Sequence, residues 1–143
     1  PSEHYNTGGA QTLVNGVVGS LPWSGNEWLG WNNGKSMEVI IDFGKEVDIS
    51  NLTVSFLEAR ESWIHFPESV QCGAVKTATD FESTTDMKNL IIDSKDKNFW
   101  TAKNLKIKSR YFLIKASPTD IIPEGNPGSG NQPWLFCSEI IVE

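Results

Sequence analysis

Short runs of alternating apolar and polar residues constrain the fold of this chain more than any other feature. From Met37 to Phe43 the apolar residues occupy every second position, and Glu38 and Asp42 stand among the residues between them. A period of two is typical of a β-strand with one buried face. Gly44 follows directly and is expected to end this strand.

Similar strand patterns recur along the rest of the chain. They cover residues 52–56, 70–74, 105–108, 111–116 and 135–142, with a further strand beginning at Trp100 and a short one expected at 12–14. Loops containing Gly, Pro and Asn separate them, and no window has a convincing helical stripe, although residues 79–82 are compatible with one helical turn. The sequence therefore predicts an all-β protein, an antiparallel jelly-roll β-sandwich.

The length of 143 residues predicts one domain. Residues 1–10 are polar and rich in glycine, and we interpret them as an N-terminal arm or linker. Residues 11–143 then form the domain. The two cysteines, Cys72 and Cys137, share strand parity with apolar neighbours, so buried free thiols are favoured over a single bridge.

Charge and hydropathy narrow the classes of partner. The net charge is −6 and the lysines are scattered between Lys35 and Lys115, which disfavours nucleic acid. No apolar run approaches the roughly 20 residues of a membrane-spanning helix, so we expect no membrane insertion. A neutral partner and a monomeric chain are the expectation.

Few residues here could carry catalysis. The chain has two histidines, His4 and His65, and no nucleophile elbow, phosphate loop or zinc-site spacing. Glu58 and Glu61 lie in one short loop with Arg60 between them, unlike a glycosidase pair that flanks a cleft. We therefore expect no enzymatic activity.

Aromatic residues in polar loops are candidates for ligand recognition, and a sugar is one ligand that suits them, because sugars stack their C–H faces on aromatic rings and present hydroxyls to planar polar groups. Trp23 is the best platform by context. The other candidates are Asn26, Arg60, Glu61, Trp63, His65 and Asn131, the last from the long loop 122–133. The alternatives are that the tryptophans pack in the core, that Arg60 pairs with a neighbouring glutamate, and that His65 is structural.

Glu139 stands out because it is an even number of residues away from the apolar residues Leu135, Cys137 and Ile141 of the last strand. Its side chain is therefore expected on the same face of the strand as theirs. A buried carboxylate needs hydrogen-bond donors, a cation or a proton. One alternative is that Glu139 accepts backbone hydrogen bonds or pairs with a lysine. The other is calcium, with side-chain oxygens from Asn15 and Ser20 and carbonyls from Val14 and Val17.

Several segments, in this order, carry a family resemblance: LVNG at 13–16, WLGW at 28–31, MEVIIDFG at 37–44 and WLFCSEIIV at 134–142. The chain resembles the coagulation factor V/VIII type C (discoidin) family, and within it carbohydrate-binding module family 32 (CBM32). Residues 62–67, SWIHFP, resemble the version at the C-terminus of bacterial family 20 hexosaminidases, which are chitobiase-like. The resemblance implies a jelly-roll fold and favours a structural calcium held by Asn15, Ser20 and Glu139, with Asn15 replacing the usual Asp and weakening affinity.

The resemblance also implies a function. The chain is expected to be a non-catalytic module that tethers a secreted glycoside hydrolase, such as a β-N-acetylhexosaminidase, to glycans ending in galactose or N-acetylhexosamine. Its partners would be the glycan and the catalytic domain of the same protein, and its location secreted, periplasmic or on the bacterial cell surface. The alternative is a structural module that packs on the parent enzyme without binding sugar. Phospholipid recognition is disfavoured by the acidic charge.

Overall fold

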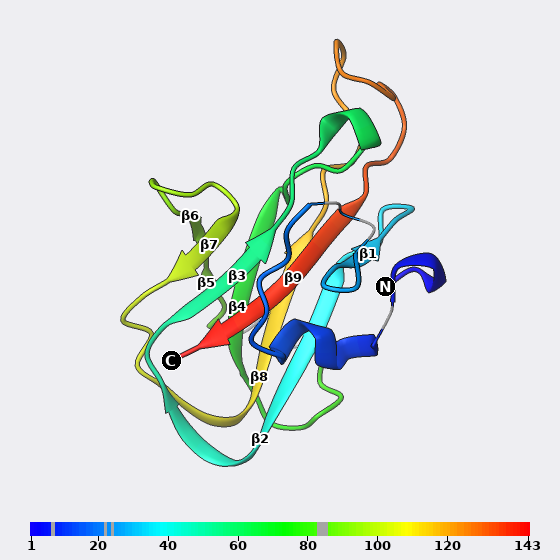
Figure 1. Cartoon of the computed structure of the whole chain (residues 1–143). Helices are drawn as coiled ribbons and strands as arrows, with labels where there is room; N and C mark the ends of the chain where they lie inside the picture. The colour runs from blue at the N-terminus through cyan, green and yellow to red at the C-terminus, as the bar shows by residue number, and fades with distance from the viewer. Residues whose placement is uncertain (7, 22, 24, 83–85) are drawn as a thin grey trace.

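Two antiparallel sheets face each other in the computed structural model, which describes residues 1–6, 8–21, 23, 25–82 and 86–143 (Figure 1). One sheet has the order β1-β9-β3-β7-β6 and the other β2-β8-β4-β5. The strands are β1 Leu29–Trp31, β2 Met37–Ile49, β3 Leu52–Phe56, β4 Ser69–Val75, β5 Lys88–Asn89, β6 Ile91–Ile92, β7 Phe99–Ala102, β8 Ile107–Ser117 and β9 Leu135–Val142. The predicted all-β sandwich is confirmed.

Short 3₁₀ helices complete the described elements: η1 Glu3–Tyr5, η2 Gly9–Val14 and η3 Arg60–Ser62. The strand expected at 12–14 is therefore wrong, because these residues belong to η2. The helical turn expected at 79–82 is a tight turn instead, in which the Phe81 N–H donates to the Thr79 carbonyl at 3.0 Å. No helix in the described part of the chain is long and apolar enough to cross a membrane.

Gly44 does not end its strand, contrary to expectation. β2 continues to Ile49, and its register with β8 shifts between Asp42 and Val47. Gly44 has a φ of 77°, and its N–H donates to Asp42 Oδ1 at 2.8 Å. The glycine therefore marks an irregularity within a long strand, where the left-handed backbone suits a residue without Cβ.

β8 also joins what looked like two strands. The patterns at 105–108 and 111–116 merge into Ile107–Ser117, which pairs with β2 on one side and β4 on the other. Ser109 and Arg110 interrupt the apolar pattern where the register with β2 shifts, and Ser109 pairs with Val47 beyond that shift.

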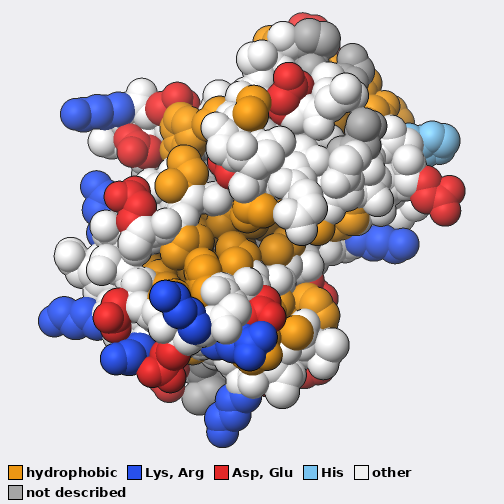
Figure 2. All heavy atoms as spheres, turned by 60° about the horizontal axis from the view of Figure 1, so that its bottom comes forward, with side chains coloured by type: hydrophobic (Ala, Val, Ile, Leu, Met, Phe, Trp, Pro, Cys, Tyr) orange, Lys and Arg blue, Asp and Glu red, His pale blue; other side chains and the backbone are white. Residues whose placement is uncertain are grey.

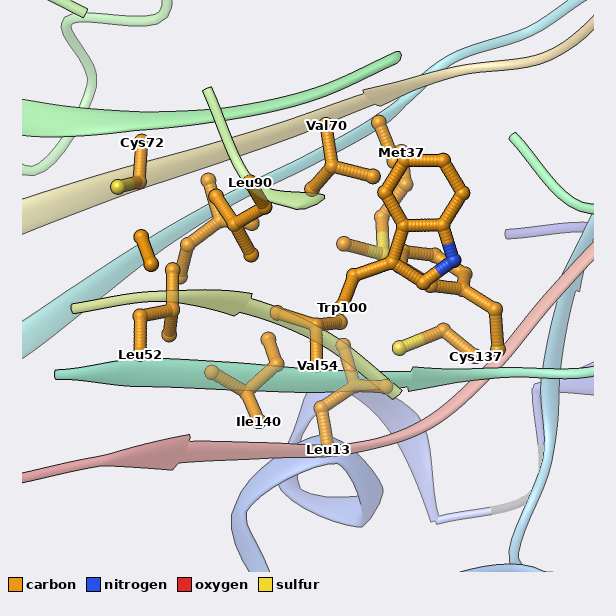
Figure 3. Close-up of a cluster of buried hydrophobic side chains, with 14 of the residues drawn as sticks. Leu13, Met37, Leu52, Val54, Val70, Cys72, Leu90, Trp100, Cys137 and Ile140 are labelled. Carbon is orange, nitrogen blue, oxygen red and sulfur yellow. The ribbon is translucent and has the colours of Figure 1, made fainter. Parts of the chain in front are cut away.

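The core lies between the sheets (Figure 3). Leu13 from η2 joins side chains from both sheets, among them Met37, Val54, Phe112 and Ile140. Cys72 and Cys137 are buried and free, as predicted. Burial raises the pKa of the Cys72 thiol to about 12, and it raises the pKa of the Cys137 thiol as well.

The N-terminal residues lie against the domain rather than apart from it. The Ser2 N–H donates to the Gly30 carbonyl at 2.6 Å, beside strand β1. The Tyr5 ring packs on Phe136, with ring centroids 5.0 Å apart. Tyr5 is thereby placed next to the end of the sandwich that carries the candidate site.

Candidate functional site

Two long loops meet at one end of the sandwich, the top of Figure 1. One joins β3 to β4 and contains η3, and the other joins β8 to β9. Ile64 forms isolated bridges with Ala59 of its own loop and with Trp134 of the other. The Trp134 N–H donates to the Trp63 carbonyl at 2.7 Å, and the His65 N–H donates to the Trp134 carbonyl at 3.1 Å. Backbone bonds therefore hold the two loops together as one unit.

Trp63 lies at the junction of these loops. It has a left-handed backbone, with φ of 63°, and it is the exposed member of the six tryptophans, at 38%. Gly128 of the late loop approaches its indole so closely that a Cβ there would lie 2.5 Å from Trp63 Nε1. The late loop is thus in direct contact with the indole, which a side chain at position 128 would prevent.

Polar side chains of the same two loops are bonded to one another or to the loop backbone. Arg60 Nη1 donates to Asn126 Oδ1 at 3.2 Å, which links the early loop to the late one, and Arg60 Nε lies 3.3 Å from Glu58 Oε2. Asn131 Nδ2 donates to the Gly128 carbonyl at 2.9 Å. An exposed guanidinium held by two partners presents its remaining N–H donors in a fixed plane, which suits sugar hydroxyls.

The other candidates from the early loop differ in how deeply they are buried. Glu61 is exposed in η3, whereas His65 is buried beneath the loop surface. His65 Nε2 has no hydrogen-bond partner among the described residues. Burial, and secondarily the positive charge of Arg60, lower the pKa of His65. The imidazole is therefore held neutral inside the loop base.

Trp23 is not an isolated platform. Its ring packs edge-on against Tyr5, at 5.5 Å between centroids, and against Phe136, at 5.8 Å. With Trp134 these residues form an aromatic cluster, and they line a cavity of about 60 Å³ together with Ser62 and Ile64. That volume admits about two waters and no sugar ring. Asn26, three positions beyond Trp23, is exposed.

The cluster contains a residue that the sequence did not reveal. Tyr5 contacts Trp23, Trp134 and Phe136, although it belongs to the segment interpreted as an arm. No local pattern marks this contact, because its partners lie at opposite ends of the chain.

Glu139 reaches its position through a β-bulge. Val54 of β3 pairs with Ile140, but Phe56 pairs with Cys137, so β9 has one residue more than β3 over this interval. Cys137 and Ile140 both lie in the core, while Ile141 is 39% exposed. The parity that placed Glu139 with Ile141 on an apolar face is therefore wrong beyond the bulge.

The Glu139 carboxylate is buried against the segment after η2. Its Oε2 accepts hydrogen bonds from the N–H groups of Gly16 and Val17, each at 3.0 Å. Asn15 Oδ1 also accepts from the Val17 N–H, at 2.9 Å. Burial raises the pKa of Glu139, and the amide bonds oppose that effect.

These contacts bear on the calcium hypothesis. Oε2 faces two N–H groups whose dipoles present positive ends, so this oxygen is already satisfied by hydrogen bonds. The Ser20 carbonyl accepts from Trp28 Nε1 at 2.9 Å, and Val14 and Val17 are exposed. Within the described residues no group of three or more His, Cys, Asp or Glu could hold a metal ion. This geometry satisfies Glu139 by hydrogen bonds, and calcium at this corner stays a prediction.

Comparisons with solved structures agree with the fold. No protein-family model and no curated protein sequence matches the chain. The CBM32 of AlyQ, solved in complex with 4,5-unsaturated mannuronic acid, matches at 12% identity with a TM-score of 0.53, over 100% of this chain and 92% of that one. A structure of CpGH89CBM32-6, produced by Clostridium perfringens, matches at 16% identity with a TM-score of 0.51, over 96% and 86% of the two chains.

A structure from the Streptococcus pneumoniae beta-galactosidase BgaA matches at 14% identity with a TM-score of 0.60, over 92% of this chain and 82% of that chain. Identities this low establish the fold alone. The chain has the β-sandwich of CBM32 and discoidin-like domains, as the sequence resemblance implied.

Proposed function

We propose that this chain is a non-catalytic carbohydrate-binding module and that the joined loops around Trp63 bind the end of a glycan. The observation that carries the proposal is an exposed indole at the junction of two loops that also carry Arg60, Asn126 and Asn131. The likeness of the fold to CBM32 modules supports it.

In this mechanism the sugar stacks its C–H face on Trp63, and Arg60 and the asparagine amides bind its hydroxyls. Trp23 and His65 position the loops from below. Such an open site binds with modest affinity, and tethering then raises the concentration of substrate near an attached catalytic domain. The substrate class is terminal galactose or N-acetylhexosamine, and the parent a secreted bacterial glycoside hydrolase, such as a family 20 hexosaminidase.

A second function is favoured by a different observation. Val14 at the end of η2 is exposed, and so are Val17, Val18 and Leu21 on the segment that follows. Apolar side chains gathered on a surface commonly mark a protein interface. In this alternative the chain packs on its parent enzyme and binds no sugar.

A glycan array probed with the whole chain distinguishes the two functions. We expect signal on glycans ending in galactose or N-acetylhexosamine, and loss of about tenfold or more in Arg60→Ala, as for a charge-assisted hydrogen bond. Arg110→Ala is the matched control, because Arg110 is also exposed and paired with a carboxylate, Asp42, away from the loops. Equal binding by Arg60→Ala, Trp63→Ala and wild type would refute the site, and a blank array would favour the packing module.

A further inference from the structure

A second concave surface lies away from the loop site. It is an open groove of about 930 Å³ between the edge strands β5 and β6, and it is also lined by residues 93–95 and 101–106. In Figure 1 the strands β6 and β7 lie to the left, whereas the two loops of the candidate site project from the top. We call this surface the basic groove.

The groove is positively charged on an acidic protein. Four of the 12 Lys and Arg residues line it, namely Lys88, Lys95, Lys103 and Lys106, against one acidic residue, Asp93. Lys95 and Lys103 both act electrostatically on Asp93, so their charges converge there. Lys and Arg side chains also border an apolar hollow on the face that Figure 2 shows.

These lysines carry charge that is not neutralised within the fold. The ion pairs of the described residues are made by Arg60, Arg110 and Lys115. Asp93 is engaged in its own turn, where Oδ1 accepts the Lys95 N–H at 2.7 Å. A groove with unpaired cations on one side of a chain of net charge −6 is complementary to an anionic ligand.

Two exposed isoleucines contribute apolar surface to the groove. Ile91 is 69% exposed and Ile92 is 44% exposed, while Leu90 just before them is buried in the core. Leu105 and Ala102, which also line the groove, are buried in the core. Exposed aliphatic side chains among lysines suit a ligand that combines an acidic group with C–H surface.

Part of the groove's rim has a left-handed backbone conformation. Asn104 and Lys106 both have positive φ, 57° and 51°, which is uncommon for residues other than glycine. The Leu105 N–H donates to the Ser50 carbonyl at 2.8 Å, and the Asn104 N–H donates to Asn51 Oδ1 at 3.3 Å. Lys103 and Lys106 are thus displayed on a loop anchored to the β2–β3 turn, and strained backbone of this kind is often found at binding sites.

We propose that the basic groove binds acidic saccharides, with carboxylate or sulfate groups on the lysines and the sugar ring over Ile91 and Ile92. This site is separate from the proposed loop site and does not depend on it. Nucleic acid fits less well, because the described residues that line the groove include no aromatic ring for base stacking. A bilayer fits less well because the isoleucines belong to a concave surface.

Calorimetric titration of the whole chain tests the groove. The probes are tetragalacturonate, a chondroitin sulfate tetrasaccharide and neutral chitotetraose, at low salt. We expect one or both acidic probes to bind, and K95Q/K103Q to weaken that binding by about tenfold per lysine.

K45Q/K76Q is the matched control, since both residues are exposed, lie outside the groove lining and give the same change in net charge. It should bind within about twofold of wild type. Ile91→Ser should also weaken binding, which a purely ionic attraction would not predict.

Several results would overturn the proposal. Equal losses in the two lysine pairs would show general charge attraction, and loss in Arg60→Ala with K95Q/K103Q unaffected would assign acidic sugars to the loops. No binding of either acidic probe to wild type, or groove-dependent binding of phosphatidylserine vesicles in its place, would also contradict it. The loop site is judged separately, by neutral glycans and the Arg60→Ala variant.

Discussion

At the scale of single residues, the contact between Gly128 and Trp63 determines how the two loops fit. A Cβ at position 128 would meet the indole nitrogen at 2.5 Å, and the φ of 76° disfavours a side chain in any case. We expect Gly128→Ala to lower the free energy of unfolding by about 1–3 kcal/mol and to weaken glycan binding. Urea unfolding and glycan titration measure the two effects.

Gly125→Ala provides the control for that substitution. Gly125 has a φ of 87°, and a Cβ there would have no other atom within 4 Å, so the variant shares the backbone strain without the collision. It should lose stability but keep glycan affinity. Equal loss of affinity in both variants would mean that the indole contact does not position the site.

His65 gives a prediction about pH. Because burial lowers its pKa in the fold, the neutral form is favoured there, while the unfolded chain keeps a pKa near 6.5. Its contribution to stability is therefore complete above that pH and is lost as the pH falls through the lowered pKa of the folded state. We expect the free energy of unfolding of wild type to fall from pH 7 to pH 5. The fall should be smaller in the His65→Gln variant. An identical pH dependence in the two proteins would exclude His65 as the cause.

At the scale of elements, the bulge in β9 places Glu139 against the Gly16 and Val17 amides. Removal of the carboxylate leaves these donors without their acceptor, so Glu139→Ala should cost about 1–3 kcal/mol of unfolding free energy. A chelator tests the calcium hypothesis at the same corner: if hydrogen bonds alone hold the carboxylate, the unfolding midpoint of wild type stays unchanged. A fall in the midpoint with chelator, reversed by added calcium, would support the metal instead.

The same bulge shows what a strand pattern can predict. Alternation is local, so the positions of β3, β4 and β9 follow from their residues alone. A bulge adds one residue and reverses parity for all that follow, and nothing in the local pattern announces it. The prediction for Gly44 was wrong for a related reason, since glycine is equally compatible with a strand end and with an irregularity inside a strand.

At the scale of the whole molecule, the candidate site was only partly predictable. Arg60, Trp63 and Asn131 stood out as polar or aromatic residues in loops. The Arg60–Asn126 contact joins residues 66 apart in sequence, and the packing of Trp23 depends on Tyr5. Such contacts follow from how the ends of the sandwich close, which single-sequence patterns do not contain. The basic groove was missed because its lysines are scattered along the chain and only the fold gathers them.

The reactivity of the two buried thiols tests whether the sandwich is closed. Burial raises the pKa of Cys72 to about 12, and Cys137 is buried as well, so thiolate is scarce and reagents cannot reach it. We expect iodoacetamide at about pH 8 to leave both cysteines unmodified in the native chain and to modify both in urea, as mass spectrometry would show. Rapid labelling of one cysteine without denaturant would indicate local opening of its sheet.

The exposure of Trp63 has an optical consequence. Three of the other tryptophans, Trp28, Trp31 and Trp100, are buried, so a soluble quencher such as iodide reaches Trp63 more readily than these. The quenchable, red-shifted part of the fluorescence therefore includes the signal of the proposed sugar platform. The protein carries its own spectroscopic reporter, and a bound glycan that shields this indole would be detected without any label.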